Sequence, residues 1–154
     1  MTLSKNTFTG EYSYSVDAKG RVNIPAKFRQ VLSKDNNNTF VITRGQDTCI
    51  WVYPLTVWQQ IETELKQLSA LSAINRTFIR NTVRHASFTT YDKQGRILLT
   101  PSLIDYAGLS KDVLIIGMVN KIELWNPETL VKVDQENMKI EQHSYDDLAD
   151  KIIL

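Results

Sequence analysis

Hydrophobic and polar residues alternate along residues 11–16, which places Tyr12, Tyr14 and Val16 on one face of an extended chain. Alternation with a period of two predicts a strand with one buried face. A second, shorter alternation follows at residues 21–24. The pattern therefore predicts two strands joined by a tight turn, read as a hairpin.

The residues of that turn have recognisable structural uses. Asp17 at the first turn position can accept a hydrogen bond from the backbone two residues on, and Gly20 can take the left-handed conformation of a bulged hairpin. Pro25 ends the second strand and suits the first turn of a helix, because its missing N–H costs nothing there. Arg21, directly after the glycine, is not required by turn geometry.

The same order of residues returns in the second half of the chain. Asp92, Gly95, Arg96 and Pro101 occupy the corresponding places, again between a strand and a short helix. Two further strands are predicted after each helix, at residues 40–43 and 49–53 in the first copy and at residues 113–117 and 122–125 in the second. Repetition of motif and element order indicates a duplicated unit with two pseudo-symmetric halves.

Helical spacing of apolar residues predicts two helices between the copies, at about residues 56–68 and 73–84. Arg76, Arg80 and Arg84 line one face of the second helix, which is compatible with a solvated face, a phosphate contact or a subunit contact. The expected fold is α+β and rich in strands. Its expected parts are a first repeat at 8–56, connecting helices at 57–85, a second repeat at 86–129 and an acidic helical tail at 130–154.

Charge and composition add modest constraints. The 154 residues carry a net charge of +1, but residues 1–44 hold seven Lys/Arg against three Asp/Glu, and residues 128–154 hold three against seven. This asymmetry suggests a local anion-binding face.

No apolar run approaches the length of about 20 residues needed to span a membrane. The start lacks a hydrophobic signal-peptide core, so a cytoplasmic protein is expected. The single cysteine, Cys49, lies in an apolar strand and is expected to be a buried thiol.

Catalytic chemistry finds little support. The chain has no Gly-rich phosphate loop, no nucleophile elbow and no cluster of zinc ligands, and His85 and His143 are far apart in sequence. Turn geometry explains Asp17 and Asp92, so they are poor candidates for an acid–base pair. We therefore expect no enzyme activity, catalytic residue, metal, cofactor or small-molecule substrate.

Nucleic-acid binding is better supported. Each turn carries outward cations, Lys19 and Arg21 in the first copy and Lys93 and Arg96 in the second. A β-ribbon fits the major groove of DNA, where the planar fork of arginine matches the guanine edge. The competing explanation for each arginine is an ion pair with the turn aspartate, which contributes roughly 0–1 kcal/mol when exposed. An acidic protein partner would suit the duplicated arginines as well.

The duplicated motif and its surroundings resemble proteins of the MraZ family. The order and spacing of the matching segments agree from about residue 8 to residue 125, including the extra residue before the second proline. The stretch before Thr7 is longer than is usual in the family. The resemblance is carried by residues 8–12, 17–21, 25–29, 92–98, 106–109 and 122–125.

The resemblance implies a bacterial transcriptional regulator built from two SpoVT-AbrB-type repeats, interleaved as an AbrB-like swapped-hairpin β-barrel. Such proteins form closed rings, are nucleoid-associated and bind short direct repeats in double-stranded promoter DNA upstream of the division and cell-wall gene cluster. They typically repress that cluster and their own gene. Ile104 stands where the family commonly has a basic residue, which implies unequal contributions from the two halves. The implied DNA-binding residues are Arg21, Arg96, Lys19, Lys93 and Lys27, with Asp17, Gly20, Pro25, Asp92, Gly95 and Pro101 as turn scaffold.

Overall fold

The computed structural model describes residues 4–152, so the first three residues of the N-terminal extension and the last two of the expected tail lie outside it. The fold is α+β, as predicted. Its strands are β1 (Phe8–Ser15), β2 (Arg21–Asn23), β3 (Thr39–Arg44), β4 (Ile50–Pro54), β5 (Ser87–Thr90), β6 (Arg96–Leu98), β7 (Asp112–Val119) and β8 (Ile122–Trp125). Its helices are α1 (Ala26–Gln30), the 3-10 turn η1 (Lys34–Asn36), α2 (Leu55–Lys66), α3 (Ala73–Val83), α4 (Pro101–Ala107) and α5 (Pro127–Lys151).

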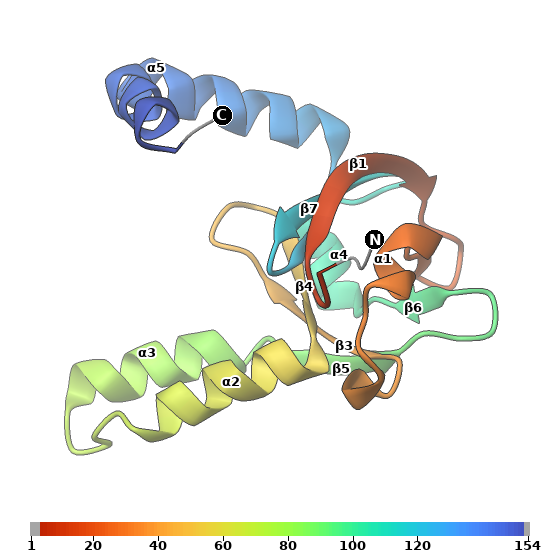
Figure 1. The fold of residues 1–154 in the computed structure, drawn as a ribbon, viewed down its shortest axis with the longest axis horizontal. Coiled ribbons are helices and arrows are strands. Elements are labelled where there is room, and N and C mark those ends of the chain that lie inside the picture. Colours follow the sequence, from red (N-terminus) through yellow and green to blue (C-terminus); the bar gives the residue numbers. More distant parts are fainter. Residues whose placement is uncertain (1–3, 153–154) are drawn as a thin grey trace.

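Helices α2 and α3 form an antiparallel arm that projects from one side of the strands, and α5 projects from the same side at the opposite end (Figure 1). Strands β1, β7, β8, β4, β3 and β5 form one sheet in that order, and β2 and β6 form a separate pair. Every pairing is antiparallel. Exchanging β1–β4 with β5–β8 reproduces the same set of pairings, which is the pseudo-symmetry expected of a duplication.

The strands on either side of each turn separate instead of pairing, so the predicted hairpins are wrong in this respect. β1 pairs along its whole length with β7, and β2 pairs with β6 of the other repeat. Val22 and Ile97 are directly opposite each other in the β2–β6 pair, and both are buried. The apolar face of each returning strand is thus covered by the other repeat, which gives each strand a cross-repeat partner.

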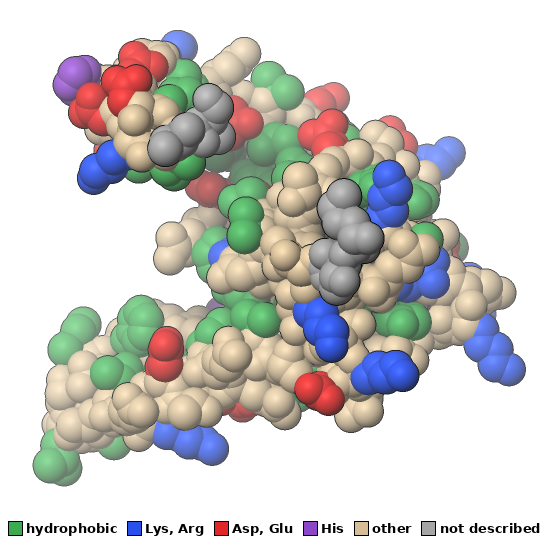
Figure 2. Space-filling model, in the orientation of Figure 1, with side chains coloured by type: hydrophobic (Ala, Val, Ile, Leu, Met, Phe, Trp, Pro, Cys, Tyr) green, Lys and Arg blue, Asp and Glu red, His purple; other side chains and the backbone are tan. Residues whose placement is uncertain are grey.

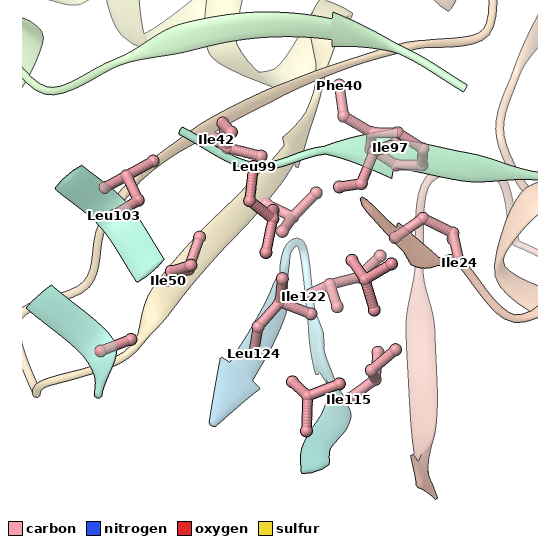
Figure 3. Close-up of a cluster of buried hydrophobic side chains, with 14 of the residues drawn as sticks. Ile24, Phe40, Ile42, Ile50, Ile97, Leu99, Leu103, Ile115, Ile122 and Leu124 are labelled. Carbon is pink, nitrogen blue, oxygen red and sulfur yellow. The ribbon is translucent and has the colours of Figure 1, made fainter. Parts of the chain in front are cut away.

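Both repeats contribute to one hydrophobic core. Ile24 and Phe40 from the first repeat meet Ile97, Leu99 and Ile122 from the second (Figure 3). Burial of apolar surface between the repeats stabilises the fold by about 25 cal/mol for each Å² removed from water. Neither repeat can therefore bury as much apolar surface alone. The two turns described below are both supported by this common core.

A buried polar cluster lies at the centre of the six-stranded sheet. Oε2 of Glu123 accepts a hydrogen bond from Nε1 of Trp51 at 2.8 Å, and Oε1 accepts one from Nε1 of Trp125 at 2.7 Å. Burial, reinforced by the charge of Glu123, raises the pKa of the Cys49 thiol. The prediction of a buried thiol is therefore confirmed.

The arm and the C-terminal helix have their own local determinants. Ser72 caps α3 by accepting a hydrogen bond from the backbone N–H of Asn75, and Nη1 of Arg76 donates to the carbonyls of Ala70 and Leu71. Arg76 thus has a structural contact in the α2–α3 loop. Helix α5 contains one residue with non-helical backbone angles, Glu141 (φ −129°, ψ 35°). Across the described residues, no helix is both long and apolar enough to cross a membrane.

Candidate functional site

The first turn is built around the carboxylate of Asp17. Its Oδ1 accepts hydrogen bonds from the backbone N–H groups of Lys19 and Arg21, each at 2.9 Å, and its Oδ2 accepts one from Nε of Arg21 at 2.8 Å. Gly20 donates its N–H to the Asp17 carbonyl and has φ of 81°, a value that strains residues with a Cβ. The aspartate and the glycine thus hold the backbone of the turn through these hydrogen bonds and this conformation.

The second turn repeats this geometry closely. Oδ1 of Asp92 accepts from the backbone of Gln94 at 2.9 Å and of Arg96 at 3.0 Å, and Oδ2 accepts from Nε of Arg96 at 2.9 Å. Gly95 has φ of 79°. The ion pair considered as the competing explanation for each arginine is thus formed in both copies.

The ion pair uses only one edge of each guanidinium. Within residues 4–152, the two terminal nitrogens of Arg21 meet no hydrogen-bond partner, and the side chain is 30% exposed. Arg96 is more constrained: Nη2 donates to Oε1 of Gln94 at 2.7 Å, and the side chain is 25% exposed. The carboxylate consequently orients the arginine while leaving the Nη edge of Arg21 available, so the ion pair and ligand binding are compatible.

The two turns interlock into a single surface. Leu99 donates its N–H to the Gly20 carbonyl, and Ile24 donates its N–H to the Gly95 carbonyl, both at 2.8 Å. Oδ2 of Asp17 also lies 3.9 Å from Nη1 of Arg96. The sequence suggests two separate tips, whereas the structure brings both arginines to one place, on the side of the molecule away from the free ends of the arm and α5 (Figure 1).

Different side chains cover the two turns. A Cβ on Gly95 would lie 2.6 Å from Nε and Cζ of Arg29, whereas a Cβ on Gly20 would lie 3.3 Å from Cδ1 of Ile104. Arg29 also donates Nε to the Ile24 carbonyl at 3.0 Å. The sequence alone predicts a solvated Arg29 on the first short helix and does not indicate this contact. Aligning the two repeats on their glycines without a gap would have found it, because Arg29 then matches Ile104.

The two prolines occupy different positions at the starts of their helices. Pro25 is the N-cap residue of α1, whereas Thr100 is the N-cap of α4 and Pro101 is at its first position. The hydroxyl of Thr100 accepts a hydrogen bond from the Leu103 N–H. The second proline is therefore not equivalent to the first, and the repeats match without the extra residue inferred from the sequence.

The three lysines predicted to bind DNA occupy unequal positions. Lys19 occupies the third position of its turn, and Lys93 occupies the second position of the other. Both are exposed, as is Lys27 on α1. The two turn lysines add exposed ammonium groups to the two oriented guanidinium groups, a set of charges suited to a polyanion. No cluster of three or more metal-ligating side chains is found in the described part of the chain.

The turn carboxylates predict a specific acid sensitivity. The backbone N–H of Arg21 and of Arg96 lowers the pKa of Asp17 and Asp92, respectively, below 3.8, with further lowering from the arginine side chains against an opposing effect of desolvation. A carboxylate whose pKa is lower in the folded than in the unfolded state stabilises the fold at pH values above its unfolded-state pKa. This stabilisation is lost as the pH falls through its folded-state pKa. Unfolding by urea at pH 3 and pH 6 should therefore differ less in the double variant Asp17→Asn/Asp92→Asn than in the wild type. Equal pH sensitivity would contradict the assignment.

Comparison with known proteins places this geometry in context. The family model described as "MraZ protein, putative antitoxin-like" matches twice, at residues 7–81 and 82–150. The chain is 44% identical to the transcriptional regulator MraZ of Natranaerobius thermophilus over 146 residues, covering 95% of this chain and 96% of that protein. It is 39% identical to the namesake from Pediococcus pentosaceus over the same length and coverage, and 46% identical to that of Halothermothrix orenii over 119 residues, covering 77% and 80%.

These relatives bear on two of the predictions. They are named as transcriptional regulators and not as enzymes, in agreement with the expectation that this chain is not an enzyme. The double match agrees with the duplication inferred from the repeated turn, and the two matches together cover most of the sequence. The chain belongs to the MraZ family.

Proposed function

We propose that this protein is a sequence-specific DNA-binding transcriptional regulator that acts as a ring oligomer on short direct repeats in double-stranded promoter DNA. Its targets would be its own gene and the division and cell-wall gene cluster, which it would repress from a cytoplasmic, nucleoid-associated location. The relatives that share its length are named as transcriptional regulators.

One observation carries the proposal: two arginines that no turn requires are oriented by carboxylates on one exposed surface. Nε of Arg21 is held by Asp17, so its two terminal nitrogens can address O6 and N7 of a guanine as a planar fork. Lys19, Lys93 and Lys27 would contact phosphates, which positions the protein without reading sequence. In this proposal Arg21 supplies more of the base contact than Arg96, whose fork is partly occupied by Gln94.

The proposed architecture joins this site to the duplication. Residues 8–56 and 86–129 would be AbrB-like repeats interleaved as a swapped-hairpin barrel, separated by connecting helices at 57–85 and followed by the acidic tail at 130–154. The exchanged pairings of β1 with β7 and β2 with β6 support this interpretation. The two turns, residues 17–21 and 92–96, then form one DNA-contacting surface per subunit, which we call the reading head.

The number of contacts explains why an oligomer is needed. One reading head neutralises few phosphates, so one subunit should bind weakly and lose affinity steeply with salt. Subunits held together on regularly spaced sites raise the effective concentration of each later contact. Affinity should therefore grow strongly with the number of repeats in the DNA.

Footprinting of the purified protein on its own upstream DNA, with its mass in solution measured in parallel, tests the proposal. Protection should cover regularly spaced short repeats, and unrelated DNA should compete only at low salt. Unprotected upstream DNA at low salt would overturn the proposal. Displacement of a bound acidic protein, with no effect of repeat-containing duplex, would instead support the rival function as an interaction protein.

A further inference from the structure

The arm exposes large apolar side chains that the described residues of the same subunit do not cover. Leu71 is 93% exposed, Ile74 is 73% exposed and Phe78 is 58% exposed, and no residue of α3 is buried. Single exposed apolar residues are ordinary, but a contiguous set on one element marks an interaction surface. Figure 2 shows hydrophobic side chains gathered along the arm on the side that faces α5.

This apolar surface continues into a groove at the base of the arm. The groove measures about 610 Å³, and its walls include Trp51, Tyr53 and Phe78. Arg84 and His85 also line it, and no carboxylate does so among the described residues. Burial lowers the pKa of His85, with additional lowering from the cations of Arg44 and Arg84. The groove therefore combines aromatic walls with a positive potential and fits an apolar, negatively charged occupant.

The distal part of α5 has those two properties. Residues 141–151 contain four Asp/Glu against one lysine. Tyr145 and Leu148 are exposed and line a shallow groove along one face of the helix together with Met138. Every described residue after Met138 is exposed, so this segment makes no buried contact within its own subunit. The helix is an amphipathic acidic segment that lacks a covering surface.

We propose that the distal part of α5, residues 141–151, docks in the groove and along the exposed face of α3 in a second copy of the chain. Charge favours a contact between α3 and α5 over a contact between two α3 helices or between two α5 segments. Residues 73–84 contain three arginines and no acidic residue, so two α3 helices would repel each other, as would two acidic α5 segments. Within one subunit, α5 and the arm are separated by an open hollow (Figure 2), which leaves both surfaces free for a neighbour.

The donated and accepting surfaces are different, so the contact is heterologous and repeats from subunit to subunit. Repeated heterologous contacts generate a ring when the rotation closes and a filament when it does not. The interlocked turns lie on the other side of the molecule (Figure 1), so assembly leaves them accessible. The inference rests on the oligomer of the proposed function and names the two surfaces that build it, but it does not depend on DNA binding.

Cross-linking between two singly substituted chains tests the contact directly. Phe78→Cys and Tyr145→Cys are made separately and co-expressed, with the fully buried Cys49 as a silent background. A short bismaleimide should join the two variants into a covalent dimer, and neither variant alone should form one. Thr63→Cys, an exposed position on α2, replaces Phe78→Cys in the control and should give no product with Tyr145→Cys. Self-linking of Tyr145→Cys, or no product from the co-expressed pair, would overturn the inference.

Charge reversal provides an independent test that does not depend on linker geometry. Arg80→Glu/Arg84→Glu should lower the mass in solution, and adding Asp146→Lys/Asp147→Lys should restore it, because the reversed charges attract again. An unchanged mass in the double variant, or a mass that stays low in the quadruple variant, would contradict the docking. Binding of a one-repeat duplex at low salt is measured on the same samples. Reduced mass with binding retained supports the docking, whereas a wild-type protein that assembles but ignores DNA defeats only the proposed function.

Discussion

Replacing Arg21 by alanine should nearly abolish binding to the operator while leaving the fold and the assembly intact. Each bidentate arginine–guanine pair contributes about 1–3 kcal/mol of discrimination, which corresponds to about 5–150-fold in affinity. In the proposed function several subunits engage adjacent repeats, so the loss would be multiplied across the array. The side chain is on the surface and is not part of the hydrophobic core, so circular dichroism and mass in solution should be unchanged.

Two related variants separate the contributions of charge and shape. Arg21→Lys keeps the cation but loses the planar fork and the Nε contact to Asp17, so it should bind operator and unrelated DNA with similar weak affinity. Arg96→Ala should weaken binding in the same direction but less, because Gln94 and Asp92 already engage its guanidinium. Normal operator binding by a folded Arg21→Ala protein in a gel-shift titration would remove Arg21 from the proposed interface.

Glu123→Gln should lower the free energy of unfolding by about 2–4 kcal/mol, a large effect for an almost isosteric change. The two carboxyl oxygens accept hydrogen bonds from the indole N–H groups of Trp51 and Trp125. Glutamine offers one acceptor oxygen, and its amide N–H₂ would face the other indole donor. Trp125 and residue 123 are buried, so water cannot reach the Trp125 donor when the amide faces it, whereas Trp51 is half-buried.

Urea unfolding followed by tryptophan fluorescence at neutral pH measures this loss. Glu136→Gln is the matched control, because Glu136 is exposed on α5 and the same substitution there should change stability by less than about 0.5 kcal/mol. If Glu123→Gln unfolds at the wild-type urea concentration with an unchanged slope, the indole contacts are not a significant source of stability.

Local chemistry made much of the fold predictable. The Asp–Gly spacing, the alternating strands and the helical spacing depend on contacts within a few residues. The repetition of one local pattern reinforces each of these interpretations. Element positions were therefore predicted well, with differences of a few residues at the ends. The same local reasoning identified Arg21 and Arg96 as residues that the turn does not need.

Pairing between the repeats could not be predicted in the same way. Alternation shows which face of β1 is apolar, but it does not distinguish a partner in the same turn from β7. The closeness of Arg29 to Gly95 and of Glu123 to two indoles likewise depends on segments that are far apart in sequence. These contacts decide how the arginines share one surface, so the candidate site was recognised by its residues but not by its shape.

The different coverings of the two turns have a consequence for orientation on DNA. Two identical halves would give the reading head a true dyad, and its matching site would be a palindrome. Arg29 covers the Gly95 turn and Ile104 covers the Gly20 turn, so the two halves of the reading head differ. A head with polarity distinguishes the two directions along a duplex. This polarity agrees with the proposed target, a motif that recurs in one direction, because a tandem array would let every subunit face the same way.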